Sequence, residues 1–202
     1  MPIFLICIIV FIIWFRVKLK QNNSTRSEAD ISYWEREQNA NFARTQDISH
    51  LDYLCVDYDK LPFSSAPTED EMELEEKIKS FGNTKMLNLI GLSNTDLKEQ
   101  YGPANLDVLT EYDQNFTDFI RTLNQWGNLL DQKKENDRAK QVLEYAVSIG
   151  SDISTSYTLL GELYAKEGFY DKVDSLIQTV ESSQFTLKAS IIRNLKLAKL
   201  KY

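Results

Sequence analysis

Residues 157–164 read YTLLGELY, and residues 123–130 read LNQWGNLL. The shift that aligns Gly127 with Gly161 also aligns apolar residues with apolar residues in the segment that follows. We call this interval, from Gly127 to Gly161, one period. Such a match indicates two copies of one helical hairpin, each burying the same side of its helices. The aligned apolar pairs are Leu123/Tyr157, Trp126/Leu160, Leu130/Tyr164, Ala139/Val173, Leu143/Ile177 and Ala146/Val180.

Short polar turns separate these helical segments. We expect Gly168 to form the turn within the second copy and Asn136 the turn within the first, because both residue types accept the backbone angles of tight turns. Before the first copy, apolar residues recur at three- and four-residue steps from Leu106 onward, which predicts one helix or two consecutive helices. The chain is therefore predicted to be mainly α.

The period and the residues of YTLLGELY resemble the tetratricopeptide repeat (TPR) family, whose repeat length is roughly 34 residues. An aromatic residue, Leu160, Gly161 and Tyr164 stand at matching offsets, while the family's usual proline at the repeat end is replaced by Ser151 and Phe185. The resemblance implies a short TPR-like α-solenoid over residues 103–202. Its open end would be covered by a C-terminal capping helix that contains residues 187–201, since a solenoid leaves an apolar face at its last repeat.

A wider resemblance covers roughly residues 45–202. The segments LDYLCVDYDKLPF, LIGLSNTDLKEQYG, LTEYDQNF and LEYAVSIG resemble uncharacterised single-span TPR membrane proteins of clostridial-type Gram-positive bacteria. This resemblance implies no known activity.

The amino-terminal run from Ile3 to Phe15 contains only apolar residues. As a helix it would rise about 20 Å, which is short of the roughly 30 Å hydrocarbon core, but Arg16, Lys18 and Lys20 can reach the interface with their long stems. We expect residues 1–17 to form an uncleaved transmembrane helix in the cell membrane. A signal peptide and an interfacial or buried helix are the alternatives. The basic residues follow the run, which predicts a cytoplasmic C-terminal domain.

The middle of the chain is less regular. We expect a juxtamembrane linker with a helix over residues 18–44, capped by Ser24 or Ser27, and an irregular covering segment with short helices over residues 45–102. Within it, residues 54–58 are expected to be extended and to pair with residues 85–92 as a short two-stranded element, although periodicity leaves the second run open between helix and strand.

Two short helices are also expected in this segment. One follows Thr68, with a thin apolar stripe of Met72, Leu74 and Ile78; its acidic residues would be solvated or would dock a basic partner. The other begins near Asn94 and ends before Pro103.

Charge and residue counts exclude several functions. The chain carries 23 Lys and Arg against 30 Asp and Glu, a net charge of -7, which disfavours a nucleic-acid partner. Two cysteines and one histidine cannot form a Cys/His metal cluster, and Ser49 beside His50 does not make a catalytic constellation. We therefore expect no enzyme activity, no metal or other cofactor and no small-molecule substrate.

The polar side of the first helix of each copy is the predicted binding surface, because in TPR hairpins these helices line the concave face. The function this indicates is a membrane-anchored adaptor that binds a peptide or helix of a partner protein. The alternative is a structural packing subunit of a membrane-associated complex without a free groove. The predicted partner-binding residues are Arg121, Asn124, Asn128, Asp131, Thr155, Thr158, Glu162 and Lys166.

Overall fold

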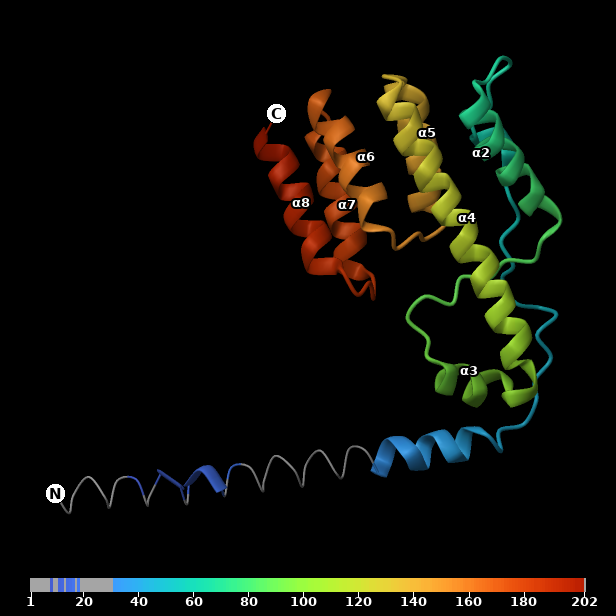
Figure 1. The fold of residues 1–202 in the computed structure, drawn as a ribbon, viewed down its shortest axis with the longest axis vertical. Helices are drawn as coiled ribbons and strands as arrows, with labels where there is room; N and C mark the ends of the chain where they lie inside the picture. Colours follow the sequence, from blue (N-terminus) through green and yellow to red (C-terminus); the bar gives the residue numbers. More distant parts are fainter. Residues whose placement is uncertain (1–7, 9–10, 13, 17, 19–30, 202) are drawn as a thin grey trace. The chain divides into compact units, whose positions relative to one another are not determined.

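The computed structural model describes residues 8, 11–12, 14–16, 18 and 31–201. These residues are mainly helical, as predicted (Figure 1). They form two compact units: the described residues of Met1–Asp47 with Ser93–Leu106, and those of Ile48–Leu92 with Asp107–Tyr202. This grouping divides the segment 45–102 between the units, whereas the sequence predicted one covering segment.

No helix in the described part of the chain is both long and apolar enough to cross a membrane. Most of the predicted anchor, residues 1–17, lies outside the described residues, and so do the expected caps Ser24 and Ser27.

The first unit contains a helical stretch at residues 31–40, the helix α3 (Asn94–Tyr101) and the 3-10 turn η3 (Pro103–Asn105). Helix α3 is capped by Ser93: the Asp96 N–H donates to Ser93 Oγ at 3.2 Å, and the Ser93 N–H donates to Asp96 Oδ2 at 2.7 Å. This reciprocal pair satisfies two backbone donors that a helix start leaves open. The predicted short helix is therefore confirmed, with its cap one residue earlier than Asn94.

The second unit is a series of helices preceded by a loop segment. Helix α4 is a single helix of 27 residues, so the run from Leu106 does not divide into two helices. Every residue of the six aligned apolar pairs between Leu123 and Val180 is buried, as predicted. The elements are η1 (Tyr58–Lys60), α2 (Glu69–Ser80), η2 (Phe81–Asn83), α4 (Leu106–Gln132), α5 (Asn136–Ser148), α6 (Ser154–Lys166), α7 (Tyr170–Ser182) and α8 (Lys188–Lys201).

The helix boundaries recur with the period of the sequence. Helix α7 begins one period after α5 begins and ends one period after α5 ends. Helix α4 ends one period before α6 ends, and α6 begins one period before α8 begins. Helix α8 therefore begins where a third first helix would begin, and it packs against α6 and α7.

The predicted two-stranded element is absent from residues 31–201, where no strand is found. The two runs do meet, but through one backbone hydrogen bond, from Leu54 N–H to Met86 O at 2.9 Å. The next donors of the second run turn to α4 instead: Leu87 N–H donates to Tyr112 O at 3.2 Å and Leu89 N–H to Asp113 Oδ1 at 3.2 Å. The prediction was wrong because the helix takes the donors that a second strand would have used.

The turn between α4 and α5 also differs from the prediction. Asn136 is the first residue of α5, and the left-handed residue is Lys134, at φ 66°. Its counterpart one period later is Gly168, at φ 80°, which forms the turn of the second copy as predicted. A lysine thus holds a conformation that favours glycine.

Candidate partner-binding face

Seven of the eight predicted binding residues belong to a set of positions that recurs, one period apart, on one side of α4 and α6. At about 100° per residue, Thr155, Glu162 and Lys166 lie opposite the buried Tyr157 and Tyr164 of α6, and Thr158 lies at the edge of the same side. Arg121, Asn124 and Asn128 hold the same positions on α4, one period earlier. We call these seven residues the α4–α6 face. Each is exposed or half-buried, so the face is open to solvent.

Asp131 follows Asn124 by seven residues, so it lies on nearly the same side of α4, and it is half-buried. Its counterpart on α6, Ala165, is buried. The counterpart of Lys166 is Gln132, which is exposed at the end of α4.

Hydrogen bonds join the helices along this face. Asn124 Nδ2 donates to Ser156 Oγ at 2.8 Å, which links α4 to α6. Asn194 Nδ2 donates to Thr158 Oγ1 at 3.4 Å, which links α8 to α6. Asn128 Nδ2 donates to the backbone and side-chain oxygens of Asn124, at 2.7 and 3.2 Å. The amide donors expected to hold a peptide are therefore already engaged within the protein, and a peptide would have to exchange partners with them.

The charges of the face have mixed sign. Arg121 lies 3.6 Å from Asp118 one turn earlier, and Glu162 lies 3.7 Å from Lys201 of α8. Exposed pairs of this kind contribute little to stability, roughly 0.2–1 kcal/mol each. They leave the face without a group of like charges.

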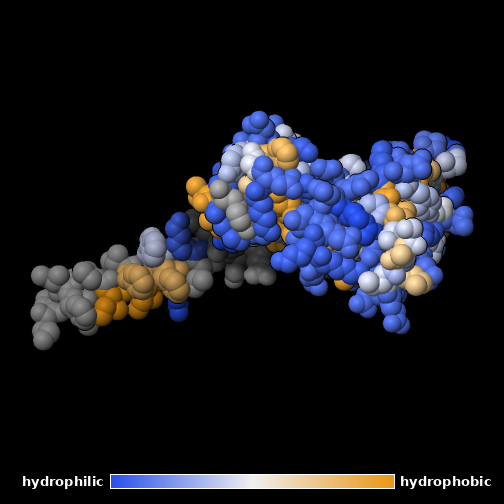
Figure 2. Space-filling model, turned by 90° about the horizontal axis from the view of Figure 1, so that it is seen from above, coloured by the Kyte–Doolittle hydropathy of each residue, from blue (hydrophilic) through white to orange (hydrophobic). Residues whose placement is uncertain are grey.

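The same register continues onto α8, the predicted capping helix, whose basic tail was also considered as a contact for acidic lipid headgroups. Ala189, Ile192, Lys196 and Leu200 follow Thr155, Thr158, Glu162 and Lys166 by one period. Together with Arg193 and Leu197 they line a shallow groove of about 440 Å³. Figure 2 shows hydrophobic atoms at the edge of the folded body where Figure 1 places α8. One further step of the same shift would have found these residues.

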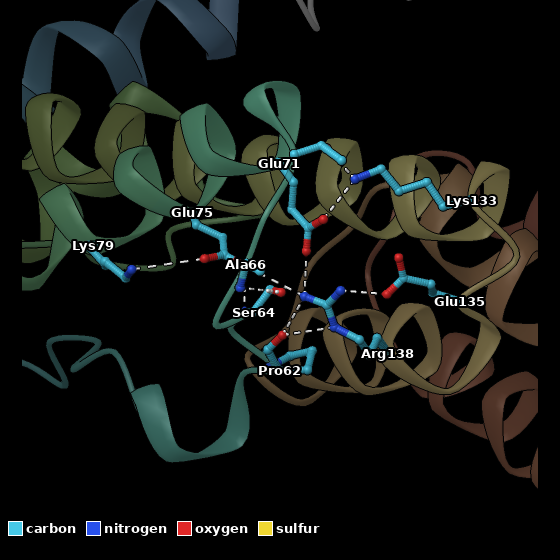
Figure 3. Close-up of polar contacts among 10 residues, drawn as sticks. Pro62, Ser64, Ala66, Glu71, Glu75, Lys79, Lys133, Glu135 and Arg138 are labelled. Atoms are coloured by element: carbon cyan, nitrogen blue, oxygen red, sulfur yellow. Dashed lines mark hydrogen bonds and ion pairs between the residues drawn. The ribbon is translucent and has the colours of Figure 1, made fainter.

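A second constellation, between α2 and the turn from α4 to α5, contains two buried carboxylates (Figure 3). Glu71 and Glu75 are each 2% exposed. Glu71 accepts from Lys133 Nζ at 2.7 Å and from the Arg138 guanidinium, and Glu75 accepts from the Ser64 N–H at 2.9 Å. Arg138 also donates to Pro62 O at 2.7 Å. We call these six residues the α2 clamp, since they fix α2 and the preceding loop to α5.

Charge balance explains how α2 buries acids. Burial alone would raise the pKa of Glu71, but the hydrogen bonds from Lys133 and Arg138 outweigh it and lower that pKa below its ordinary value. The buried side of α2 is therefore Glu71, Glu75 and Ile78, while Met72 is 45% exposed. This corrects the predicted apolar stripe, which included Met72.

The buried tyrosines of α6 act as hydrogen-bond donors. Burial raises the pKa of Tyr157 to about 12, and its hydroxyl donates to Ser151 O at 2.9 Å. Burial, and then a hydrogen bond to Glu144, raise the pKa of Tyr164 as well. Both phenols are neutral near pH 7 and tie α6 to α5 and to the loop that joins the two helices.

Within residues 31–201 and the few described before them, no three His, Cys, Asp or Glu side chains form a group suited to a metal ion. Free Cys55 is exposed. Comparison of the chain with protein-family models, curated protein sequences and solved structures gives no match.

Proposed function

We propose that α4–α8 form a TPR-like solenoid and that the protein is a membrane-anchored adaptor, which binds a peptide or helix of a partner protein through the α4–α6 face. The observation that supports this most directly is the recurrence of helix boundaries at one period, with the seven face residues exposed or half-buried on one side. In this arrangement the first helices of successive repeats present a continuous surface.

In the same proposal, residues 1–17 anchor the chain in the cell membrane and the helical domain faces the cytoplasm. The support is the uncharged apolar run to Phe15 and the placement of Arg16, Lys18 and Lys20 after it. An adaptor held in this way would search for partners along the membrane surface, where tethering raises its effective concentration.

The adaptor proposal is tested by capture of membrane proteins with the full chain. Arg121→Ala with Asn128→Ala removes one charge and one amide of the face, and we expect it to lower recovery of specific partners. The matched control is Gln141→Ala with Gln178→Ala, exposed polar residues on α5 and α7, the second helices. Equal recovery with both variants would contradict a role for the face.

Topology is tested with Cys55, which is exposed. In a Cys7→Ser background, a maleimide that cannot cross membranes should label Cys55 only after the cells are permeabilised. Labelling of intact cells would contradict a cytoplasmic domain, and a Cys7→Ser/Cys55→Ser chain controls for background.

A structural packing subunit is the second candidate. It is favoured by the internal hydrogen bonds of Asn124 and Asn128, which occupy the donors that a peptide would use. In that case the capture experiment would recover the same proteins with both pairs of variants.

A further inference from the structure

The outward side of α8 combines apolar surface with unpaired positive charge. Leu197 is 55% exposed and Leu200 is 84% exposed. Lys199 and Lys201 pair with Asp174 and Glu162, but neither Arg193 nor Lys196 forms an ion pair with any residue that the structure describes. We call Ile192, Arg193, Lys196, Leu197 and Leu200 the α8 face. A helix surface of this composition is typical of a contact site rather than of a fully solvated face.

Helix α2 carries the opposite charge on its outward side. Glu69, Glu73 and Glu76 lie opposite the buried Glu71, Glu75 and Ile78, and all three are exposed. Among the described residues none of these three has an ion-pair partner, and the exposed side chain of Met72 lies beside them. We call these three acids and Met72 the α2 face.

The two faces belong to the same compact unit and lie at its two ends. Helix α2 is fixed beside α5 by the α2 clamp, whereas α8 packs against α6 and α7 (Figure 1). Their charges also share a spacing: Glu73 and Glu76 stand at i and i+3 on one helix, and Arg193 and Lys196 stand at i and i+3 on the other. Each pair lies along about one helical turn, so two opposite charges can meet two at once.

We propose that the α8 face docks a second copy of this chain through that copy's α2 face, in a head-to-tail contact. The glutamates neutralise Arg193 and Lys196, and Met72 covers part of the apolar surface of Ile192, Leu197 and Leu200. A contact between two different faces leaves one α2 face and one α8 face open at the ends. Copies therefore add in rows or close into rings. A membrane anchor would hold such copies in one plane and favour the contact.

The contact is tested by sedimentation of the full chain in density-matched detergent over a range of concentrations. Arg193→Glu with Lys196→Glu disables the α8 face, and Glu73→Lys with Glu76→Lys disables the α2 face. We expect the unmodified chain to self-associate and either charge reversal to weaken association by more than about tenfold, since two attractions become repulsions. The control is Asp171→Lys with Glu181→Lys, which changes exposed acids of α7 by the same charge and should leave association unchanged.

Mixing gives the decisive measurement. Each reversed variant should stay monomeric alone, but an equimolar mixture should associate, because the two intact faces attract each other and the two reversed faces again carry opposite charge. The chain carrying all four changes should associate for the same reason. The inference is overturned if the mixture stays monomeric, if the control weakens association equally, or if the α8 reversal only abolishes binding to phosphatidylserine vesicles. None of these substitutions lies on the α4–α6 face. Loss of self-association can therefore be observed while partner capture persists, and loss of partner capture can be observed while self-association persists.

Discussion

Leu195 of α8 lies over Gly161 of α6 so closely that a Cβ atom on residue 161 would stand 2.3 Å from Leu195 Cδ2. Leu195 is itself the residue that follows Gly161 by one period, and it is fully buried. In the first copy the corresponding glycine meets a different helix: a Cβ on Gly127 would stand 2.7 Å from Cδ2 of Leu143, on α5. The glycine therefore leaves room for a leucine side chain in both copies, but the leucine belongs to α5 in the first copy and to α8 in the second.

Gly161→Ala should destabilise the protein by roughly 1–2 kcal/mol, because crowding Leu195 costs about 1–3 kcal/mol and the higher helix propensity of alanine offsets up to about 1 kcal/mol. Chemical denaturation of the full chain measures the change. In a Leu195→Ala background the crowding is gone, so the same substitution should become stabilising. An equal loss in both backgrounds would show that Leu195 is not the cause.

Glu71→Gln should destabilise the protein at pH 7 by roughly 3 kcal/mol, near the lower end for breaking a buried ion pair, because Lys133 and Arg138 keep some contact with water. Glu76→Gln, an exposed change on the same helix, should cost under about 0.5 kcal/mol. Equal losses, measured by denaturation, would contradict the α2 clamp.

The acid dependence of stability should also change with Glu71→Gln. The folded pKa of Glu71 lies below its ordinary value of 4.5, so the unfolded chain binds the proton first as the pH falls. Its contribution is complete above the unfolded-state pKa and is lost as the pH falls through the folded value. Denaturation at a series of pH values should therefore show a smaller decline below about pH 4.5 in the variant than in the unmodified chain.

Lys134→Gly should stabilise the protein by about 0.5–1 kcal/mol, because a left-handed lysine costs about 1–2 kcal/mol and the greater freedom of glycine in the unfolded chain cancels part of the gain. The reciprocal change, Gly168→Lys, should destabilise by a similar amount through backbone strain alone, because no atom lies within 4 Å of a Cβ placed there. Thermal unfolding checks both, and shifts in the same direction would contradict the strain argument.

Ser93→Ala should destabilise α3 by about 1 kcal/mol, since the Asp96 N–H loses its acceptor. Hydrogen exchange is the suitable readout because it resolves the helices separately. Amides of α3 should exchange faster while those of α5 and α7 keep their rates. Ser154→Ala is the control, because Ser154 begins α6 without capping it through its side chain.

In α6 the N-cap is Ile153, and Ser154 is the first helical residue. The exchange profile of Ser154→Ala should therefore match that of the unmodified chain in α3. Faster exchange throughout the protein with Ser93→Ala would instead indicate that α3 unfolds only together with the rest.

The helical part of the fold could be predicted because its signal is local and repeated. Positions such as Trp126, Leu143 and Tyr157 are apolar at helical spacing, and each is fully buried. The same period places Arg121, Asn124 and Asn128 of α4 at the positions that Thr155, Thr158 and Glu162 hold on α6. The same period, applied to Thr158, Glu162 and Lys166, leads to Ile192, Lys196 and Leu200 of the α8 face.

The errors lie where a residue's environment is made by distant parts of the chain. Glu71 reads as a solvated acid because Lys133 and Arg138, which neutralise it, are far along the chain, on the turn after α4 and on α5. Leu87 and Leu89 were expected to pair with a strand, but the acceptors of their N–H groups belong to α4. Periodicity carries no information on such pairings.

Because the helix boundaries recur with the sequence period, the repeat region can be lengthened by whole pairs of helices. Duplication of residues 154–187 would add one α6 and one α7 ahead of α8. The new connection, from α7 to the second α6, is equivalent by the period to the existing connections from α5 to α6 and from α7 to α8. Duplications of this length can therefore lengthen the protein while the helices at both ends of the repeat region stay unchanged.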